Sequence, residues 1–186
     1  TVVLGVDPGL RMTGYGVIEI SGGPGGCFNL LEAGTVSPNP RDLLENRIQK
    51  VYHHLSDIIA QFAPRVLVLE KLYAHYKHPV TACLLGHVRG AICLVCADHG
   101  LILEEHSVKR IRKALVGNGN ATKQQTQRAV EQTLHIPEGK LTLDASDALA
   151  LALGYGYMNR FETQGPQSPV KTARVPVRSR GPVRKQ

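Results

Sequence analysis

The segment RVLVLE, residues 65–70, constrains the fold most, because its four successive apolar residues do not alternate with polar ones. A strand of this kind is buried on both faces, as in a parallel sheet that helices cover on each side. A second apolar run, residues 2–6, ends in the same way: Asp7 follows it, as Glu70 ends the first. The two runs predict buried strands that each carry a carboxylate at one end.

The rest of the chain predicts a single α/β domain, since 186 residues with 42% hydrophobic content suit one compact core. Apolar runs separated by turn-rich segments such as SGGPGG indicate an antiparallel meander at the start, and apolar residues at helical spacing indicate helices further on. The expected strands are residues 2–6, 14–20, 30–36, 65–70 and 101–105. The expected helices are one that Asn39-Pro40 caps and that ends before Pro64, then 79–98, 108–116, one opened by a Thr122/Gln125 capping box, and a last one within 141–153.

Helix 79–98 is apolar nearly all round, which indicates burial on more than one side. One face is expected to pack on the sheet and the other on a symmetry mate, so that the protein forms a homodimer.

Acidic residues mark the start of the last helix as well. Asp144 and Asp147 are three residues apart, so they share one face of an otherwise Ala- and Leu-rich helix. Either aspartate alone could simply favour the positive end of the helix dipole. If both converge with Asp7 and Glu70, the four carboxylates repel one another and need cations. Oxygen ligands suit Mg2+ or Mn2+, and a pair of such ions roughly 4 Å apart supports phosphodiester cleavage.

The formal net charge of +7 is unevenly distributed. Residues 163–186 contain six basic residues, four prolines and no acid, so we expect a basic, Pro-rich tail that does not fold alone, after a folded domain at 1–162. Residues 106–130 hold six more basic residues and no acid. This polarised charge favours a polyanion such as a nucleic-acid backbone, although a solvated basic helix remains an alternative.

Four segments in this order, GVDPGLRMTGYGVIE, LVLEKLY, SVKRIRKALVGNGNATKQQ and LDASDALALAL, resemble the RuvC family of Holliday-junction resolvases. The resemblance covers about residues 1–160. It implies an RNase H-like fold, with a mixed five-stranded sheet flanked by helices. It also implies a Mg2+- or Mn2+-dependent endonuclease with two ions per site. A symmetric dimer would nick two opposed strands of a four-way DNA junction, leaving 5′-phosphate and 3′-hydroxyl ends, with RuvA- and RuvB-type branch-migration proteins as partners.

The resemblance also implies roles for individual residues. Four acids match the family's catalytic metal ligands, two lysines match those near the scissile phosphate, and an aromatic ring would stack at the opened junction centre. These residues are Asp7, Glu70, Asp144 and Asp147; Lys109 and Lys123; and Tyr73. Lys71, Arg110 and Arg112 complete the expected DNA-binding set, and Lys71 stands where an amide would be expected.

Three other functions remain open at this stage. A related nuclease could act on RNA precursors with the same acids. A sugar-kinase or actin-like ATPase also places Asp-x-Gly after its first strand, but it needs a chain about twice as long. A non-catalytic junction-binding module would bind without nicking.

We expect a cytoplasmic protein with no membrane segment. No basic region followed by an apolar stretch begins the sequence, and the run ALALALGYGYM is shorter than the ~20 apolar residues of a spanning helix.

Overall fold

The computed structural model describes residues 1–9, 11–22, 27–71 and 79–159. Tyr73 and the basic tail of residues 163–186 lie outside this part of the chain. The strands are β1 (Val2–Asp7), β2 (Thr13–Ser21), β3 (Cys27–Val36), β4 (Val66–Glu70) and β5 (Ile102–His106). The helices are α1 (Leu44–Phe62), α2 (Pro79–Asp98), α3 (Val108–Val116), α4 (Lys123–Thr133) and α5 (Leu143–Asn159).

The described strands form one mixed five-stranded sheet in the order β3-β2-β1-β4-β5. The pairs β1–β2 and β2–β3 are antiparallel, which confirms the predicted meander. Strand β4 lies between β1 and β5 and is parallel to both. Its residues 66–69 are at most 2% exposed, as the run without alternation predicted.

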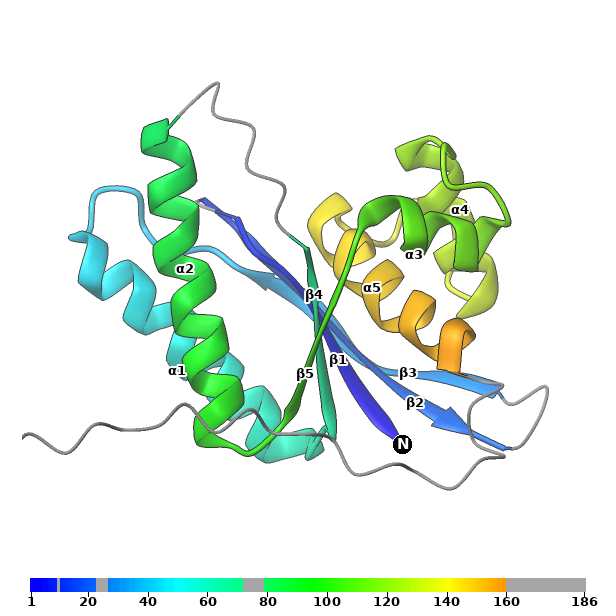
Figure 1. Ribbon diagram of the computed structural model, residues 1–186, viewed down its shortest axis with the longest axis horizontal. Helices are drawn as coiled ribbons and strands as arrows, with labels where there is room; N and C mark the ends of the chain where they lie inside the picture. Colours follow the sequence, from blue (N-terminus) through cyan, green and yellow to red (C-terminus); the bar gives the residue numbers. More distant parts are fainter. Residues whose placement is uncertain (10, 23–26, 72–78, 160–186) are drawn as a thin grey trace, which may run out of the picture.

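Helices cover both faces of the sheet (Figure 1). Alternate residues of each strand point to opposite faces, so the sheet divides two hydrophobic cores. On one face Leu4 and Leu67 pack with residues of α1 and α2. On the other face Val3 and Val68 pack with α5 and with single residues of α3 and α4.

The first helix begins later than the sequence predicted. Asn39 does not cap it: its side chain accepts a hydrogen bond from the Arg41 amide and donates one to Asp42, which closes a separate turn. Helix α1 starts at Leu44, with no side-chain cap. The prediction was wrong because Asn is equally suited to such a local turn. The predicted capping box is confirmed, and strands β2 and β3 are longer than expected.

Helix α2 is the segment on which the prediction of no membrane-spanning helix should have been tested. Val80–Asp98 is long and apolar enough to span a bilayer by length and composition, with a mean hydropathy of 1.8, so the run after Ala148 was the wrong segment to test. One face of α2 packs in the protein core through Val88, Ile92 and Val95. About 33% of this window is buried, so packing in the core accounts for part of its apolarity.

Helix α5 lies unusually close to β1 and β2. A Cβ atom added to Gly5 would fall 2.0 Å from the carbonyl oxygen of Ala148, and one added to Gly14 would fall 2.0 Å from that of Asp144. Only glycine leaves room for this approach of two backbones. The two glycines therefore decide how near the start of α5 comes to the end of β1.

We predict that Gly5→Ala destabilises the protein by about 3 kcal/mol or more, because its methyl group would displace helix backbone. Gly34→Ala is the matched control. Its Cβ would meet only the side chain of Tyr15, with the hydroxyl oxygen at 2.7 Å, and should cost less. Urea unfolding of both variants measures the difference. Equal losses would show that the approach of α5 does not depend on Gly5.

Candidate active site

The ends of β1 and β4 carry the first two acids of the site. The two strands are parallel neighbours whose last pair is Val6–Leu69, so Asp7 and Glu70 follow at the same edge of the sheet. Gly5 faces α5, and Asp7, two residues later, points to the same face. Glu70 shares the face of Val68, which packs in the α5 core. Both carboxylates therefore lie on the side of the sheet that α5 covers.

Helix α5 brings the other two acids to this edge. Gly14 is the register partner of Asp7 on β2, and it is also the residue on which the backbone of Asp144 rests. Asp147 lies one helical turn further on, over the strand ends. In Figure 1 the start of α5 and the end of β4 lie at the same edge of the sheet. The structure thus brings together all four acids that the sequence indicated.

The electrostatics of Asp7 show how crowded the acids are. Burial raises the pKa of Asp7 to about 7, and the charges of Asp147, Glu70 and Asp144 contribute to the rise. The pKa of Glu70 is raised by burial and by Asp147, while Arg112 and Arg89 oppose the change. The Asp7 carboxyl group is therefore protonated in about half of the molecules near pH 7.

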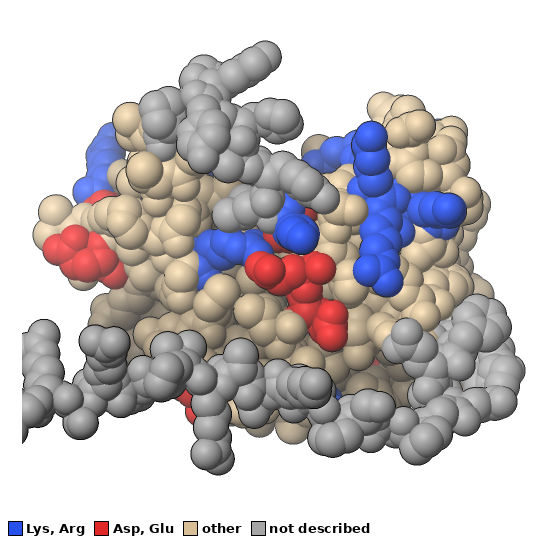
Figure 2. Space-filling view, in the orientation of Figure 1, with Lys and Arg blue, Asp and Glu red and all other residues tan. Residues whose placement is uncertain are grey.

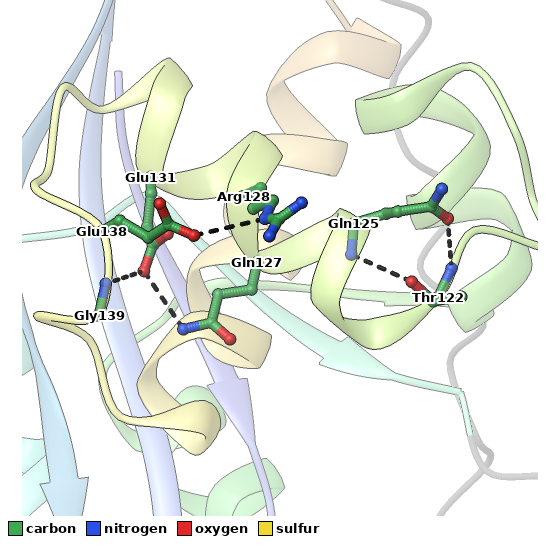
Figure 3. Close-up of polar contacts among 7 residues, drawn as sticks. All are labelled: Thr122, Gln125, Gln127, Arg128, Glu131, Glu138 and Gly139. Atoms are coloured by element: carbon green, nitrogen blue, oxygen red, sulfur yellow. Dashed lines mark hydrogen bonds and ion pairs between the residues drawn. The ribbon is translucent and has the colours of Figure 1, made fainter.

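Lys123 is the basic residue in direct contact with the acids. Its Nζ atom lies 2.5 Å from Oδ2 of Asp147, and this hydrogen bond raises the pKa of the lysine. Lys123 is the first residue of α4. The Thr122 hydroxyl accepts from the Gln125 amide, and the Gln125 side chain accepts from the Thr122 amide (Figure 3). The capping box thus fixes the residue beside Lys123.

A second polar cluster fixes the far end of α4. The buried Glu131 carboxylate accepts hydrogen bonds from the Gln127 side chain and the Gly139 amide, and Arg128 pairs with Glu138 (Figure 3). These contacts tie the connection between α4 and α5 to α4. Sequence reasoning did not identify Glu131, because glutamate is rarely buried, whereas this one is 4% exposed.

A cavity of about 180 Å3 lies among the acids. Its lining comprises Asp7, Glu70, Val108, Ile111, Arg112, Lys123, Thr126, Asp147, Ala150 and Leu151. Arg112 was expected to bind DNA, and it lines this cavity together with three of the acids. Lys109 was expected beside the scissile phosphate. It does not line the cavity and is exposed, and its carbonyl group packs against Gly119.

The other expected DNA-binding residues that the structure describes do not line the cavity. Arg110 is exposed on α3, and Lys71 is exposed just after β4, where its amide donates to the carbonyl of His106. In Figure 2 basic side chains lie over α3, to one side of acidic side chains in the middle of this face. The predicted role of each basic residue remains a prediction.

The donor set of the cavity fits a hard divalent cation. Carboxylate oxygens are the ligands that Mg2+ and Mn2+ prefer, and burial together with the charges of the neighbouring acids raises the pKa of Asp7. Within the described ranges, no group of three or more His, Cys, Asp or Glu side chains is already arranged to hold an ion. One of the acids, Asp147, forms an ion pair with Lys123.

Comparison with known proteins identifies the family. A family model described as crossover junction endodeoxyribonuclease RuvC matches residues 3–155. The chain belongs to the RuvC family. A RuvC of Rhodopirellula baltica is 40% identical over 156 residues, which cover 84% of this chain and 86% of the relative. A RuvC of Lawsonia intracellularis is 34% identical and covers 93% of this chain and 96% of its own.

Solved structures show the same RNase H-like fold. Thermus thermophilus RuvC superimposes with a TM-score of 0.80 at 24% identity, covering 88% of this chain and 98% of its own. The yeast mitochondrial Holliday junction resolvase Ydc2 gives 0.63 at 12% identity, covering 86% of this chain and 80% of its own. The mixed sheet flanked by helices, expected from the RuvC resemblance, is confirmed.

The raised pKa of Asp7 predicts that the metal-free protein loses stability as the pH rises. An unfolded aspartate loses its proton near pH 3.8 and the folded one near 7. Between these values the unfolded chain binds fewer protons, so stability falls through this window and stays low above it. Asp7→Asn should therefore be more stable than the wild type at pH 8 in EDTA, by up to about 4 kcal/mol.

Urea unfolding at pH 4 and pH 8 measures this effect, and the difference should close at pH 4. Asp57→Asn, an exposed site on α1 at the opposite face, is the control and should show no such pH dependence. Equal stability of Asp7→Asn and wild type at both pH values would contradict the crowding of the acids.

Proposed function

We propose that this chain resolves four-way DNA junctions by hydrolysing phosphodiester bonds with divalent metal ions, in homologous recombination and DNA repair. The observation that carries the proposal is the cavity lined by Asp7, Glu70 and Asp147, with Asp144 close enough to act on Asp7, in a chain of the RuvC family. Relatives carry the name crossover junction endodeoxyribonuclease, and one solved structure is described as T. thermophilus RuvC in complex with a Holliday junction substrate.

Asp7, Glu70, Asp144 and Asp147 would hold two Mg2+ or Mn2+ ions. Ions of this kind lower the pKa of water, which is the nucleophile, and stabilise the leaving oxygen. The acids need this positive charge, since Asp7 keeps its proton up to about pH 7 without it. Cleavage would leave 5′-phosphate and 3′-hydroxyl ends.

The basic residues of the cavity bind the DNA phosphate. Arg112 and Lys123 reach the acids from α3 and α4, so they place positive charge at the point where a phosphate must approach carboxylates. Lys109, Arg110 and Lys71 add contacts to the flanking backbone, and Tyr73 stacks on an unpaired base at the junction centre. The tail of residues 163–186 adds nonspecific phosphate contacts or docks a partner.

Amide substitutions test the acids. Asp7→Asn, Glu70→Gln and Asp147→Asn should each reduce cleavage by at least ~100-fold and leave junction binding intact, because each removes a ligand and spares the basic surface. Asp144→Asn should act in the same direction. Asp57→Asn is the control with normal activity. Near-normal cleavage by any of the first three variants would remove that residue from the site.

One assay separates the proposed function from the alternatives. An immobile four-way junction, a linear duplex and an RNA hairpin are incubated with Mg2+ or Mn2+, and the cuts are mapped. Paired symmetric nicks in the junction support the proposal. Faster cutting of the hairpin favours an RNA nuclease, and junction binding without nicks favours a binding module.

We also propose that two copies associate through α2, so that two sites meet the two opposed strands. The face of α2 that points away from the core carries Leu94, which is 55% exposed, and Gly86 and Gly90, around which a Cβ would find open space. These residues follow one another at four-residue spacing, so they form one apolar stripe that a second helix can approach closely. A homodimer of this kind has two-fold symmetry.

Light scattering tests the dimer. The wild type should show about twice the chain mass of 20.2 kDa, and Leu94→Lys should shift the mass toward that of a single chain, because the lysine places a charge in the stripe. Leu43→Lys, at a residue 65% exposed beside α1, is the control and should remain dimeric. A wild-type monomer that still nicks junctions in symmetric pairs would overturn the dimer.

The remaining partners follow from the RuvC family alone. We propose that RuvA- and RuvB-type proteins move the junction before it is cut, and that the protein works in the cytoplasm, where its DNA substrate lies.

A further inference from the structure

Arg89 is a charged residue in the middle of the apolar helix α2, and its side chain is only 10% exposed. Its Nη1 atom donates a hydrogen bond of 2.7 Å to the main-chain carbonyl of Glu70. Its Nη2 atom donates to the carboxylate of Glu105 on β5 and forms an ion pair with it. One guanidinium thus connects α2 with the ends of two strands. Figure 2 shows acidic and basic side chains meeting between α2 and β5.

The carbonyl that Arg89 binds lies at the end of β4, beyond the last residue that pairs with β1. The ladder between β1 and β4 ends at the Val6–Leu69 pair, one residue before Glu70. On the other side the amide of Lys71 donates to the carbonyl of His106, which continues the contact with β5. Arg89 adds a charged donor to the Glu70 carbonyl, and such hydrogen bonds are stronger than those between neutral groups.

The main chain and side chain of Glu70 point to different partners. Its carbonyl is bound by Arg89 of α2, whereas its carboxylate lines the cavity with Asp147 and Arg112. Repulsion from Asp147 and burial both act against the ionised carboxylate. A residue under such repulsion keeps one orientation only if its backbone is fixed.

We propose that Arg89 is a positioning residue that fixes the end of β4, and with it the Glu70 carboxylate, for binding of the divalent cation. Arg89 does not line the cavity, and it acts through its hydrogen bond to the Glu70 carbonyl. This inference rests on the proposed metal-dependent cleavage, and it adds a residue that is contributed by the helix on the opposite face. Partners that orient metal ligands typically change metal affinity 10- to 100-fold when they are removed.

Three variants separate positioning from general stability. Arg89→Met removes the donors and keeps a long apolar side chain. Arg89→Lys keeps the charge and can reach one of the two acceptors. Glu105→Gln weakens the ion pair and leaves the hydrogen bond to the Glu70 carbonyl. Arg128→Gln is the control, since Arg128 also pairs with a glutamate, but the side chains of this pair are 68% and 77% exposed.

The first measurement uses the metal-free protein and does not depend on activity. Hydrogen exchange of the Lys71 amide, which bonds to the His106 carbonyl, should be at least ~10-fold faster in Arg89→Met, intermediate in Arg89→Lys and unchanged in Glu105→Gln and Arg128→Gln. If Arg89→Met does not fold, Arg89→Lys decides the result. Unchanged exchange at Lys71 in a folded Arg89 variant would overturn the proposal.

The second measurement is the Mg2+ concentration that gives half-maximal junction cleavage. It should rise ~10- to 100-fold in Arg89→Met and less in Arg89→Lys, with unchanged junction affinity in the absence of Mg2+. A loss of maximal rate without a change in Mg2+ dependence would overturn the positioning role. If the wild type does not cut junctions, the proposed function fails, and calorimetric titration with Mg2+ together with Lys71 exchange still decides the role of Arg89.

Discussion

The close contact between α5 and the first two strands is the constraint on which the site depends. Gly5 and Gly14 leave no side chain between the sheet and the helix, so backbone rests on backbone. Because Gly14 pairs with Asp7 across the sheet and also supports Asp144, one contact sets the distance between acids that are far apart in the sequence. A side chain at either glycine would separate the helix acids from the strand acids.

This arrangement places the function of the protein in conflict with its stability. Carboxylates that are packed together and partly buried resist ionisation. The pKa of Asp7, raised to about 7, reflects the free energy needed to ionise it in the folded protein. Lys123 offsets part of it through its contact with Asp147, and Arg112 opposes the rise in the pKa of Glu70. The cavity lies at the ends of β1 and β4, where Ile111, Ala150 and Leu151 of the core under α5 form part of its wall.

The two faces of the sheet serve the site in different ways. The face with α3, α4 and α5 supplies the cavity and its basic residues, and the α4 contacts around Glu131 hold the connection to α5. The face with α1 and α2 supplies no lining residue among those described, but Arg89 reaches from it to the backbone of Glu70. Helix α2, for which we propose contact with a second copy, therefore also contacts the main chain of Glu70.

The sequence by itself predicted the strands, most helices and the four candidate acids. An apolar run that ends in an acid, or two acids three residues apart on a helix, depends only on residues that are near in the chain. It did not determine where α1 begins, because Asn39 serves a local turn as well as a cap. Nor did it show that Arg112 lines the cavity while Lys109 does not, since both are basic residues of one short helix and only the rotation of α3 on α5 distinguishes them. The buried position of Arg89 was equally hidden. Its partners lie on two strands that are joined to α2 only through the fold, so their meeting was decided by the tertiary structure.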